Sequence, residues 1–520
     1  MLAKSHSFGV LGIEAYPVEI EIDVSRGLPA VNLVGMADTA IRESKERVKS
    51  AIKNSGFEWP QERITISLAP SDIKKEGACF DLAIALGILA ATEQVDKERL
   101  KDYYTLGELS LDGSLRPVRG ILPISMTVAK AKTKNILLPA QNSKEAALVS
   151  GVNVWPAQHL KEAVALLHEL EGSGPFIVDL DNLFQETRLY ALDFSEVKGQ
   201  YLAKRALEVA VSGGHNIAMI GPPGSGKTML AKRIPTIMPE LTLEEALEVT
   251  KVHSVMGTLP NKFGVIGTRP FRAPHHSISS VALIGGGSMP QPGEISLAHR
   301  GVLFLDELPE FHRDCLEALR QPLEDEYIRV CRIFKSFTFP ASFMLVAAMN
   351  PCPCGHYTDP KKACRCHPNQ IAKYMGRISG PLLDRIDIHI EIPAVKYKEL
   401  SDTKEAESSE AIRARVEKAR LVQQERFSAK MPGGSTASCG GKGEKIYCNS
   451  QMNTKLIKKY CILNDEAKEL LKMAMQELGL SARAYDKILK VARTIADLAA
   501  SELIQAEHIS EAIQYRSLDR

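Results

Sequence analysis

Short runs of alternating apolar and polar residues mark the N-terminal part of the chain. Residues 18–24 alternate strictly, which predicts a strand with one buried face, and residues 64–68 repeat the pattern. Residues 41–52 carry apolar side chains at helical spacing among many charges, and residues 80–91 read as an apolar helix. Residues 1–170 are therefore predicted to form one mixed α and β domain.

The hydrophobic pattern changes after a linker, which we place at residues 171–189 because Gly, Ser and Pro there interrupt regular structure. In residues 190–398, short apolar strands alternate with helical stretches, which is typical of a parallel sheet covered on both faces. Residues 399–520 are charged and helical, and a Gly/Ser/Lys-rich insertion at residues 432–450 interrupts them. The expected fold class is therefore α/β, with a helical region at the C-terminal end.

Composition and charge narrow the range of partners only slightly. The 520 residues include 65 Lys and Arg against 63 Asp and Glu, so any DNA-binding surface must be a local patch. The first residues lack the apolar core of a signal peptide, and no uninterrupted apolar stretch reaches about 18 residues, so no membrane contact is expected. Ten cysteines without a secretion signal favour a reducing, cytoplasmic location, where grouped thiols more often bind metal than form disulfides.

A phosphate-binding loop follows the apolar strand predicted at residues 216–220. Its glycines let backbone N–H groups turn inward around phosphates, and the next helix presents its positive end to them. Lys227 is expected to reach the β- and γ-phosphates of ATP, and Thr228 is expected to bind Mg²⁺. The pattern is met at every fixed position by Gly221, Pro222, Pro223, Gly224, Ser225, Gly226, Lys227 and Thr228.

Two further apolar strands end in polar residues that suit ATP hydrolysis. Residues 301–305 lead into Asp306, which is expected to hold Mg²⁺, and Glu307, which is expected to polarise the attacking water. Residues 344–349 lead into Asn350, which is expected to help orient that water against the γ-phosphate. A turn-capping role is the alternative for Asn350, but its position after the other two motifs favours the functional interpretation. The sequence therefore predicts an ATP-hydrolysing enzyme.

The order of these motifs resembles that of AAA+ ATPases, and two arginines extend the resemblance. Residues 381–387 look like the arginine-finger segment of the branch that includes magnesium chelatase and the MCM helicases, and residues 481–483 look like its second sensor. The resemblance implies that Arg385 reaches the ATP of a neighbouring subunit and that Arg483 contacts nucleotide through the lid. For each arginine, a surface or interface salt bridge is the alternative.

Two adjacent histidines lie in a segment that narrows the family. Residues 271–276, which include His275 and His276, and residues 292–299 are characteristic of the magnesium-chelatase-like group. Adjacent side chains of an extended segment point to opposite faces, so we assign no metal to the histidines. We expect them instead to organise the nucleotide site or a subunit interface.

The N-terminal domain resembles the catalytic domain of Lon protease, which has the fold of ribosomal protein S5 domain 2. The resemblance rests on residues 66–81 and 106–113. With the AAA+ motifs, it makes the chain similar along nearly all its length to the YifB/ComM family of magnesium-chelatase-like ATPases. The resemblance implies an N-terminal Lon-like α+β domain, a P-loop AAA+ α/β domain and a C-terminal helical lid. It also implies a DNA-binding homo-hexamer, because the family includes branch-migration helicases of natural transformation.

Peptide cleavage by the Lon-like domain is not expected. Lon uses a serine that a lysine activates, whereas this chain carries Cys79 at the serine position and Leu122 near the lysine position. Leu122 cannot act as a base, and a thiol beside an apolar helix is expected to be buried and unreactive. We therefore interpret the domain as a scaffold or a DNA-guiding collar.

Two CxC pairs within residues 352–367 predict a structural zinc site. Nine residues separate the pairs, and a glycine and an Asp-Pro step between them favour a chain reversal that brings four thiolates together. His356 or His367 could replace one thiol, and a set of free, reduced cysteines is the alternative to a metal site. The expected ligands are Cys352, Cys354, Cys364 and Cys366.

A candidate DNA-contacting hairpin lies at residues 328–339, which alternate in strand fashion. In this AAA+ branch, a hairpin at this place projects into the central pore. Arg332 and Lys335 near its tip could bind phosphates, and Phe334 could stack on a base. The glycine-rich residues 285–289 are a second candidate pore loop, and a hairpin whose aromatic side chains pack into the core is the alternative.

The resemblance favours a hexameric, ATP-driven DNA motor that acts on recombination intermediates, with single-stranded or branched DNA as its partner and ATP and Mg²⁺ as cofactors. The alternative is a magnesium-chelatase-type motor that remodels a protein partner, although chelatase motors lack the Lon-like domain. An ATP-dependent protease is a third hypothesis, against which the missing lysine argues. Stimulation of the ATPase by DNA, activation by a chelatase partner and cleavage of an unfolded protein would distinguish the three.

Overall fold

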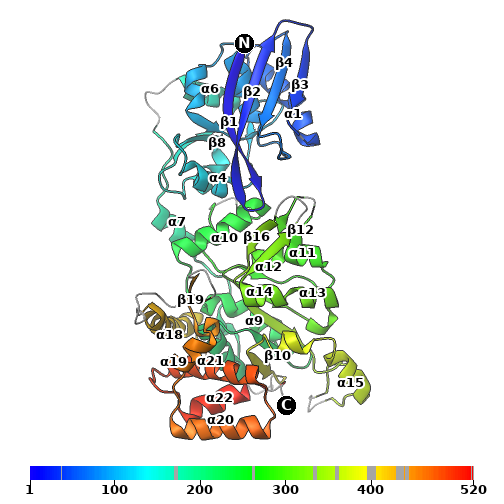
Figure 1. Cartoon of the computed structure of the whole chain (residues 1–520), viewed down its shortest axis with the longest axis vertical. Helices are drawn as coiled ribbons and strands as arrows, with labels where there is room; N and C mark the ends of the chain where they lie inside the picture. Colours follow the sequence, from blue (N-terminus) through cyan, green and yellow to red (C-terminus); the bar gives the residue numbers. More distant parts are fainter. Residues whose placement is uncertain are drawn as a thin grey trace. The chain divides into compact units, whose positions relative to one another are not determined.

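The computed structural model forms two compact units (Figure 1). The first comprises Met1–Leu189, Leu243–Gly267 and Ser288–Pro292, and the second comprises Tyr190–Thr242, Thr268–Gly287 and Gly293–Arg520. The structure describes residues 1–36, 38–75, 77–168, 174–260, 264–287, 289–331, 336–357, 362–394, 406–428, 438–439, 444–516 and 518. The segment 243–267 thus packs with the N-terminal unit, although it lies within the ATPase domain drawn from the sequence. The domain boundaries drawn from the sequence stay predictions.

A seven-stranded sheet of order β3-β4-β2-β1-β5-β8-β9 forms the centre of the first unit. β2 runs antiparallel to its neighbours β1 and β4, and the remaining neighbours are parallel. Alternate residues of β2 and β4, such as Ile20, Ile22, Ile64 and Ile66, are fully buried, as their alternation predicted. The strands of this unit are β1 (Leu2–Leu11), β2 (Glu14–Ser25), β3 (Ala30–Val34), β4 (Arg63–Ala69), β5 (Tyr103–Thr105), β6 (Glu108–Leu109), β7 (Leu115–Arg116), β8 (Asn135–Pro139), β9 (Asn153–Ala157) and β13 (Gln291–Pro292).

Helix α2 is the core helix of the first unit. All of its residues are buried, and it packs on β1, β2 and α1, which explains why its sequence is apolar on every face. Its one carboxylate, Asp81, accepts a hydrogen bond from Nε of Arg47 at 3.0 Å. The helices of this unit are α1 (Thr39–Asn54), α2 (Asp81–Ala91), α3 (Lys97–Lys101), α4 (Ile121–Val128), α5 (Ser143–Ala146), α6 (Leu160–His168), α7 (Leu180–Glu186) and α10 (Leu243–Met256).

A five-stranded parallel sheet of order β11-β14-β17-β10-β18 forms the centre of the second unit and confirms the predicted parallel sheet. β10 comes first in the chain but lies between β17 and β18, so the carboxyl ends of β10, β14 and β17 meet at one edge. Every residue of these three strands is buried. The strands are β10 (Ile217–Ile220), β11 (Phe271–Arg272), β12 (Gly285–Gly286), β14 (Val302–Leu305), β15 (Tyr327–Cys331), β16 (Ser336–Pro340), β17 (Met344–Met349), β18 (Ile388–Glu391), β19 (Ser438–Cys439) and β20 (Glu444–Lys445).

The C-terminal region forms helices, as its charged, helical pattern predicted, and they are drawn in orange and red in Figure 1. Their role as a lid stays a prediction. α21 packs on α22, α18 and α8, and its buried residues join the hydrophobic core around the parallel sheet. No described helix is both long and apolar enough to cross a membrane. The helices of the second unit are α8 (Tyr201–Gly213), α9 (Lys227–Ile237), α11 (Ser280–Ile284), α12 (Glu294–Leu297), α13 (Arg313–Ala318), α14 (Arg320–Asp325), α15 (Pro368–Met375), α16 (Gly380–Leu383), α18 (Ser409–Ser428), α19 (Thr454–Tyr460), α20 (Asp465–Glu477), α21 (Ala482–Leu498) and α22 (Ala506–Gln514).

A buried histidine makes the stability of this unit depend on pH. Burial, and then the guanidinium of Arg516, lower the pKa of His389 on β18 to about 3. In the unfolded chain this histidine has a pKa near 6.5. Below that pH, protons bind the unfolded state more tightly than the folded state, so the free energy of unfolding falls, by about 2 kcal/mol at pH 5. We therefore expect His389→Gln to weaken the fall in unfolding free energy between pH 7 and pH 5. An unchanged pH dependence, equal to that of the exposed control His312→Gln, would contradict this expectation.

Candidate nucleotide-binding site

A glycine-rich turn connects β10 to α9 at the carboxyl edge of the parallel sheet. Gly224 and Gly226 have φ angles of +76° and +87°, which residues with a Cβ rarely adopt. At the start of the turn, the backbone N–H of Gly221 donates to the carbonyl of Met349 at 3.2 Å, which ties the turn to the end of β17. A strand, a glycine-rich turn and a helix N-terminus follow one another here, an arrangement whose free N–H groups attract phosphates.

Lys227 lies inside this turn, with 8% of its surface exposed. Its Nζ donates to the carbonyls of Gly221 at 2.7 Å and Pro222 at 3.0 Å, and to Oδ1 of Asn350 at 3.3 Å. Burial lowers the pKa of Lys227, and the nearby carboxylate of Asp306 opposes this shift. The ammonium is therefore held at the point that the phosphate loop encloses, beside the residue expected to orient water.

The two expected magnesium ligands lie in direct contact. The hydroxyl of Thr228, at the start of α9, donates to Oδ2 of Asp306 at 2.8 Å. Asp306 follows the last residue of β14, and its Oδ1 accepts the backbone N–H of Glu307 at 3.0 Å. A hydroxyl and a carboxylate oxygen at this spacing can share one hard cation such as Mg²⁺.

Glu307 has an unusual backbone conformation, with a φ angle of +54°. Residues other than glycine seldom adopt this conformation, and such strain is concentrated at functional sites. The Glu307 carboxylate lies 3.2 Å from Nδ1 of His276, which the sequence did not single out as its partner. A carboxylate held by an imidazole is suited to positioning a water molecule and accepting its proton.

The expectation that His275 and His276 point to opposite faces is wrong. Their ring centroids lie 4.0 Å apart, and Nδ1 of His275 is 2.9 Å from the hydroxyl of Ser277. The reason is that the extended segment ends at His275 and His276 begins a turn, so the alternation of a strand does not apply. His276 nevertheless lies 3.2 Å from the Glu307 carboxylate, and a role of the histidines in organising the nucleotide site stays a prediction.

Arg385 of the predicted finger segment and Arg483 of α21 each contact an acidic residue of their own chain. The Arg385 guanidinium donates to the carbonyl of Pro381 at 2.6 Å and pairs with Glu324 of α14. Arg483, at the start of α21, pairs with Asp384 at 3.1 Å. The structure thus joins the two arginines to the same short segment, and their roles toward ATP stay predictions.

The sequence did not reveal a buried polar network that is centred on Asp387, the last residue of the predicted finger segment. Asp387 forms an ion pair with Nζ of Lys487 at 2.5 Å and lies 2.8 Å from Nδ1 of His215. Nε2 of His215 is 2.9 Å from the hydroxyl of Thr494. Burial raises the pKa of Asp387, but the Lys487 ammonium and then His215 outweigh it and hold that pKa well below its usual range. Because Lys487 and Thr494 belong to α21, the network fixes the lid helix to the base of β18.

Four cysteines gather in the segment that follows Asn350. Sγ of Cys364 lies 3.7 Å from Sγ of Cys352 and 3.6 Å from Sγ of Cys354, and all four sulfur atoms lie within 4.8 Å of one another. Backbone N–H groups of Arg365 and then His356 lower the pKa of Cys354 to about 6. The reversal that the sequence predicted therefore brings the two CxC pairs together, and zinc as their ligand stays a prediction.

The comparisons with known proteins cover the whole chain. Three family models match in succession: subunit ChlI of Mg-chelatase at residues 20–142, magnesium chelatase subunit ChlI at residues 193–400, and the C-terminal part of that subunit at residues 406–516. Competence protein ComM of Haemophilus influenzae is 44% identical over 522 residues, which cover 100% of this chain and 98% of ComM. The protein YifB of Escherichia coli is 43% identical over 525 residues, with the same coverage. The chain belongs to the YifB/ComM family of magnesium-chelatase-like proteins.

Membership of the YifB/ComM family supports ATP and Mg²⁺ as the ligands of this site, because the chelatase subunit models describe AAA+-like ATPases. The cluster of Lys227, Thr228, Asp306 and Asn350 fits both ligands. Lys227 and the backbone N–H groups of the turn suit phosphate oxygens, and the oxygens of Thr228 and Asp306 suit Mg²⁺.

The chain also shares a weaker similarity with proteases. Lon protease of Trichlorobacter lovleyi is 24% identical over 164 residues, which cover 29% of this YifB/ComM protein and 20% of the protease. Burial, and then the carboxylate of Asp81, raise the pKa of the half-buried Cys79 to about 12, so its thiol stays protonated at neutral pH. Leu122 is fully buried in α4. These surroundings argue against Cys79 as a nucleophile.

The predicted hairpin is present as β15 and β16, which pair in antiparallel register from Tyr327 with Pro340 to Cys331 with Ser336. The three residues expected at its tip, Arg332, Phe334 and Lys335, lie outside the described residues, so their contact with DNA stays a prediction. The arms themselves differ in burial, because Ile328 and Phe339 are buried while Arg329 and Thr338 are exposed. The arms therefore anchor the hairpin on one face only.

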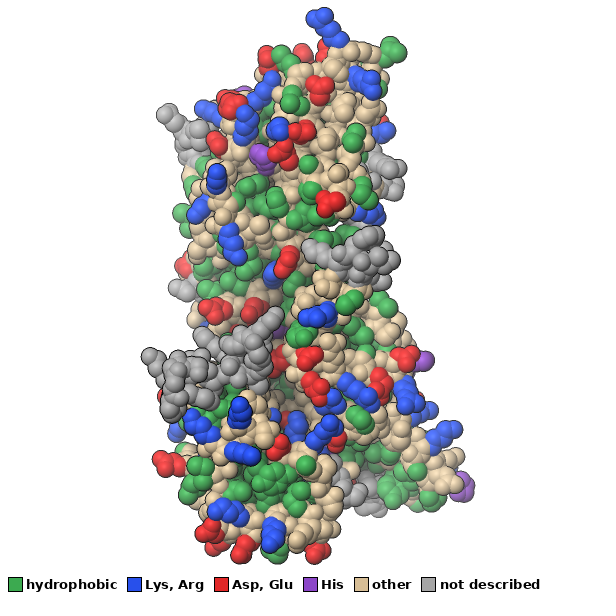
Figure 2. Space-filling view, in the orientation of Figure 1, with side chains coloured by type: hydrophobic (Ala, Val, Ile, Leu, Met, Phe, Trp, Pro, Cys, Tyr) green, Lys and Arg blue, Asp and Glu red, His purple; other side chains and the backbone are tan. Residues whose placement is uncertain are grey.

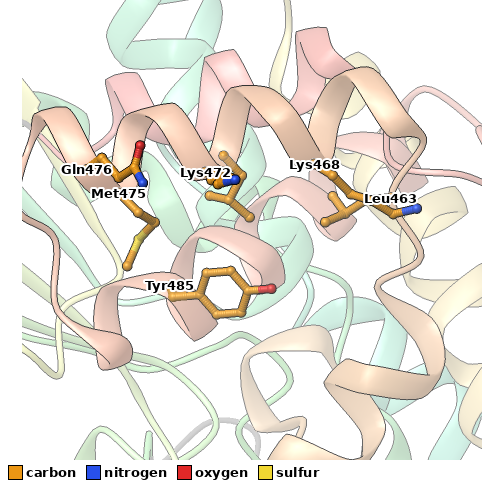
Figure 3. A pocket seen from close by; sticks show the side chains of 7 residues that line it. Leu463, Lys468, Lys472, Met475, Gln476 and Tyr485 are labelled. Atoms are coloured by element: carbon orange, nitrogen blue, oxygen red, sulfur yellow. The ribbon is translucent and has the colours of Figure 1, made fainter.

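The C-terminal helices of this YifB/ComM protein carry an apolar pocket between α20 and α21. Its volume is about 380 Å³, and hydrophobic side chains gather over the lid helices at the bottom of the view in Figure 2. In Figure 3 the Tyr485 ring lies beneath α20, between Met475 and Leu463. The lining residues are Leu463, Lys468, Leu471, Lys472, Met475, Gln476 and Tyr485, and none belongs to the nucleotide site.

Proposed function

We propose that this chain is an ATP-hydrolysing motor that assembles as a homo-hexamer and moves single-stranded or branched DNA. The observation that supports hydrolysis most directly is the contact between the phosphate loop and the two strand ends beside it. Lys227 lies 3.3 Å from Asn350, and Thr228 lies 2.8 Å from Asp306. Four residues from three strand ends thus face one point, as a phosphoryl-transfer site requires.

Each of these residues has a distinct task in hydrolysis. Lys227 and the N–H groups of the loop would bind the β- and γ-phosphates, and Thr228 and Asp306 would hold Mg²⁺. The cation supplies positive charge that neutralises the charge developing on the phosphates. Asn350 orients the attacking water, and Glu307, held by His276 at 3.2 Å, accepts its proton.

Assembly is proposed to complete the site. Arg385 would contact the ATP of a neighbouring subunit, where its guanidinium neutralises charge in the transition state. Within one chain it pairs with Glu324, so reaching a neighbour requires exchanging this carboxylate for phosphate oxygens. Arg483 contacts Asp384 beside it and would report the state of the lid to the same segment.

DNA as the moving partner is supported by the relatives and by the hairpin. ComM, 44% identical to this chain, is a competence protein, which suggests a competence-related function. The hairpin β15–β16 has an exposed outer face, and its predicted tip residues Arg332, Phe334 and Lys335 suit phosphates and bases. Action on recombination intermediates in the cytoplasm, as in natural transformation, is part of the same proposal.

The second candidate is a chelatase-type motor that remodels a protein partner. It is favoured by the matches to the magnesium chelatase subunit models along most of the chain. The two candidates share the ATPase and differ in what stimulates it.

DNA-dependent ATP hydrolysis distinguishes the two candidates. We expect single-stranded DNA and a four-way junction to raise kcat for ATP hydrolysis several-fold, and the junction to act at lower concentration than a linear duplex of the same sequence. Replacing both predicted tip cations, as in Arg332→Ala with Lys335→Ala, should weaken the DNA effect and leave the basal rate unchanged. Hydrolysis that no DNA changes would favour the protein-remodelling candidate.

A further inference from the structure

The sulfur atoms of the four cysteines lie close enough together to surround one metal ion. Four thiolates that surround one zinc ion at about 2.3 Å lie roughly 3.8 Å apart in a tetrahedron. The distances from Sγ of Cys364 to its two neighbours, 3.7 and 3.6 Å, match that value, and Cys352 and Cys354 are 3.3 Å apart. Four thiolate ligands leave no open position on zinc, so the ion would not itself take part in chemistry.

The first CxC pair packs against the phosphate loop. Gly355 follows this pair, and its N–H donates to the carbonyl of Cys352 at 2.9 Å, so both belong to one tight turn. A Cβ placed on Gly355 would lie 2.5 Å from Cδ of Pro223 in the phosphate loop and 3.9 Å from Cγ of Asn350. The turn that holds the first two thiols is therefore in van der Waals contact with the loop that would hold ATP.

The second CxC pair leads back to the same place. α15 begins two residues after Cys366, and its buried Tyr374 lies beside the backbone of Asn350. Oδ1 of Asn350 in turn accepts a hydrogen bond from Nζ of Lys227 at 3.3 Å. Both ends of the cysteine segment thus converge on Asn350, and Asn350 contacts the phosphate-loop lysine.

We propose that these four cysteines bind a zinc ion whose task is to hold the phosphate loop and Asn350 in the geometry needed for ATP hydrolysis. A bound ion cross-links the two CxC pairs, which fixes the turn at Gly355 and the start of α15 together. Without the ion, the segment loses this cross-link and Asn350 loses its support, because the binding free energy of such a metal is free energy of folding for its loop. Zinc is therefore a positioning cofactor of the nucleotide site.

Metal content and activity are measured separately, because this role rests on the proposed ATPase. We expect purified full-length protein to contain one zinc ion per chain by elemental mass spectrometry. Cys364→Ser should lose most of this zinc and should lower kcat for ATP hydrolysis about tenfold or more, the size of effect that supporting residues of metal sites show. Cys79→Ser, a change at a half-buried cysteine of the other compact unit, should keep both zinc and the basal rate.

A second pair of variants separates loss of metal from loss of contact. Gly355→Ala leaves every thiol in place but pushes a methyl group into Pro223, so it should keep one zinc ion and still lower kcat about tenfold or more. Gly56→Ala is the matched control, because Gly56 has a similar φ angle of +78° and open space around its Cβ. It should keep both zinc and the rate.

Three results would overturn the proposal: wild-type protein without zinc, zinc-free Cys364→Ser with full activity, or Gly355→Ala with full activity. Wild-type protein that binds zinc but hydrolyses no ATP would instead refute the proposed ATPase and, with it, the positioning role.

Discussion

Replacing Glu307 with Gln is expected to lower kcat for ATP hydrolysis by about 100-fold or more and to leave the affinity for ATP nearly unchanged. A general base contributes roughly 10²- to 10⁴-fold, and glutamine keeps the shape of glutamate without its ability to accept a proton. The Glu307 carboxylate is not among the groups that would bind the phosphates of ATP, since it contacts Nδ1 of His276 at 3.2 Å. Steady-state ATPase kinetics and titration with a fluorescent ATP analogue measure the two quantities.

Glu310→Gln provides the control for this substitution. Glu310 is a neighbouring carboxylate that pairs with Arg377 at 2.7 Å, and its replacement should leave kcat within about twofold of the wild type, as expected for an exposed pair. A Glu307→Gln variant that retained a tenth of the wild-type rate would show that another group activates the water. A loss of ATP affinity equal to the loss of rate would place Glu307 among the binding residues instead.

Replacing Arg385 with Ala is expected to have an effect at least as large, about 10³-fold in kcat, as for other arginines supplied across a subunit interface. A more specific result is expected when Arg385→Ala protein is mixed with Glu307→Gln protein. A ring that contains Arg385→Ala and Glu307→Gln subunits has some interfaces at which an intact Glu307 meets an intact Arg385. If subunits mix at random in equal amounts, roughly a quarter of the interfaces are complete, so the mixture should recover part of the wild-type rate.

The mixing experiment decides between an arginine that acts across the interface and one that acts within its own chain. Arg385 pairs with Glu324 in its own chain, so an effect on folding must be excluded. Arg377→Ala, which breaks the exposed pair with Glu310, should keep the rate, and Arg385→Ala should keep the wild-type thermal unfolding temperature within a few degrees. Two inactive variants that stay inactive when mixed would contradict a role for Arg385 in the neighbouring site.

The sequence predicts those parts of the site whose residues are neighbours in the chain. The apolar run before Gly221 and the carboxylates after residues 301–305 locate the ends of β10 and β14, because a buried parallel strand must be followed by a polar turn. The contact of Thr228 with Asp306 then follows from the sheet, whose carboxyl ends share one edge. The same argument places Asn350 beside Lys227.

Contacts that join distant segments are not visible in the sequence. Asp387 meets His215 and Lys487 across 172 and 100 residues, and no local pattern marks the latter two as its partners. The partnership of His276 with Glu307 depends on where an extended segment turns, and element boundaries are the least certain part of a pattern-based prediction. The packing of residues 243–267 with the N-terminal unit likewise depends on tertiary contacts of α10 with α4.

Movement of a DNA junction tests the central proposal most directly. A synthetic junction with homologous arms and labelled strands is incubated with wild-type protein and ATP, and the released strands are followed over time. The account predicts that strands are exchanged only with hydrolysable ATP and Mg²⁺, and that Glu307→Gln binds the junction but leaves it intact. A wild-type protein that hydrolyses ATP while the junction stays intact would contradict a DNA motor.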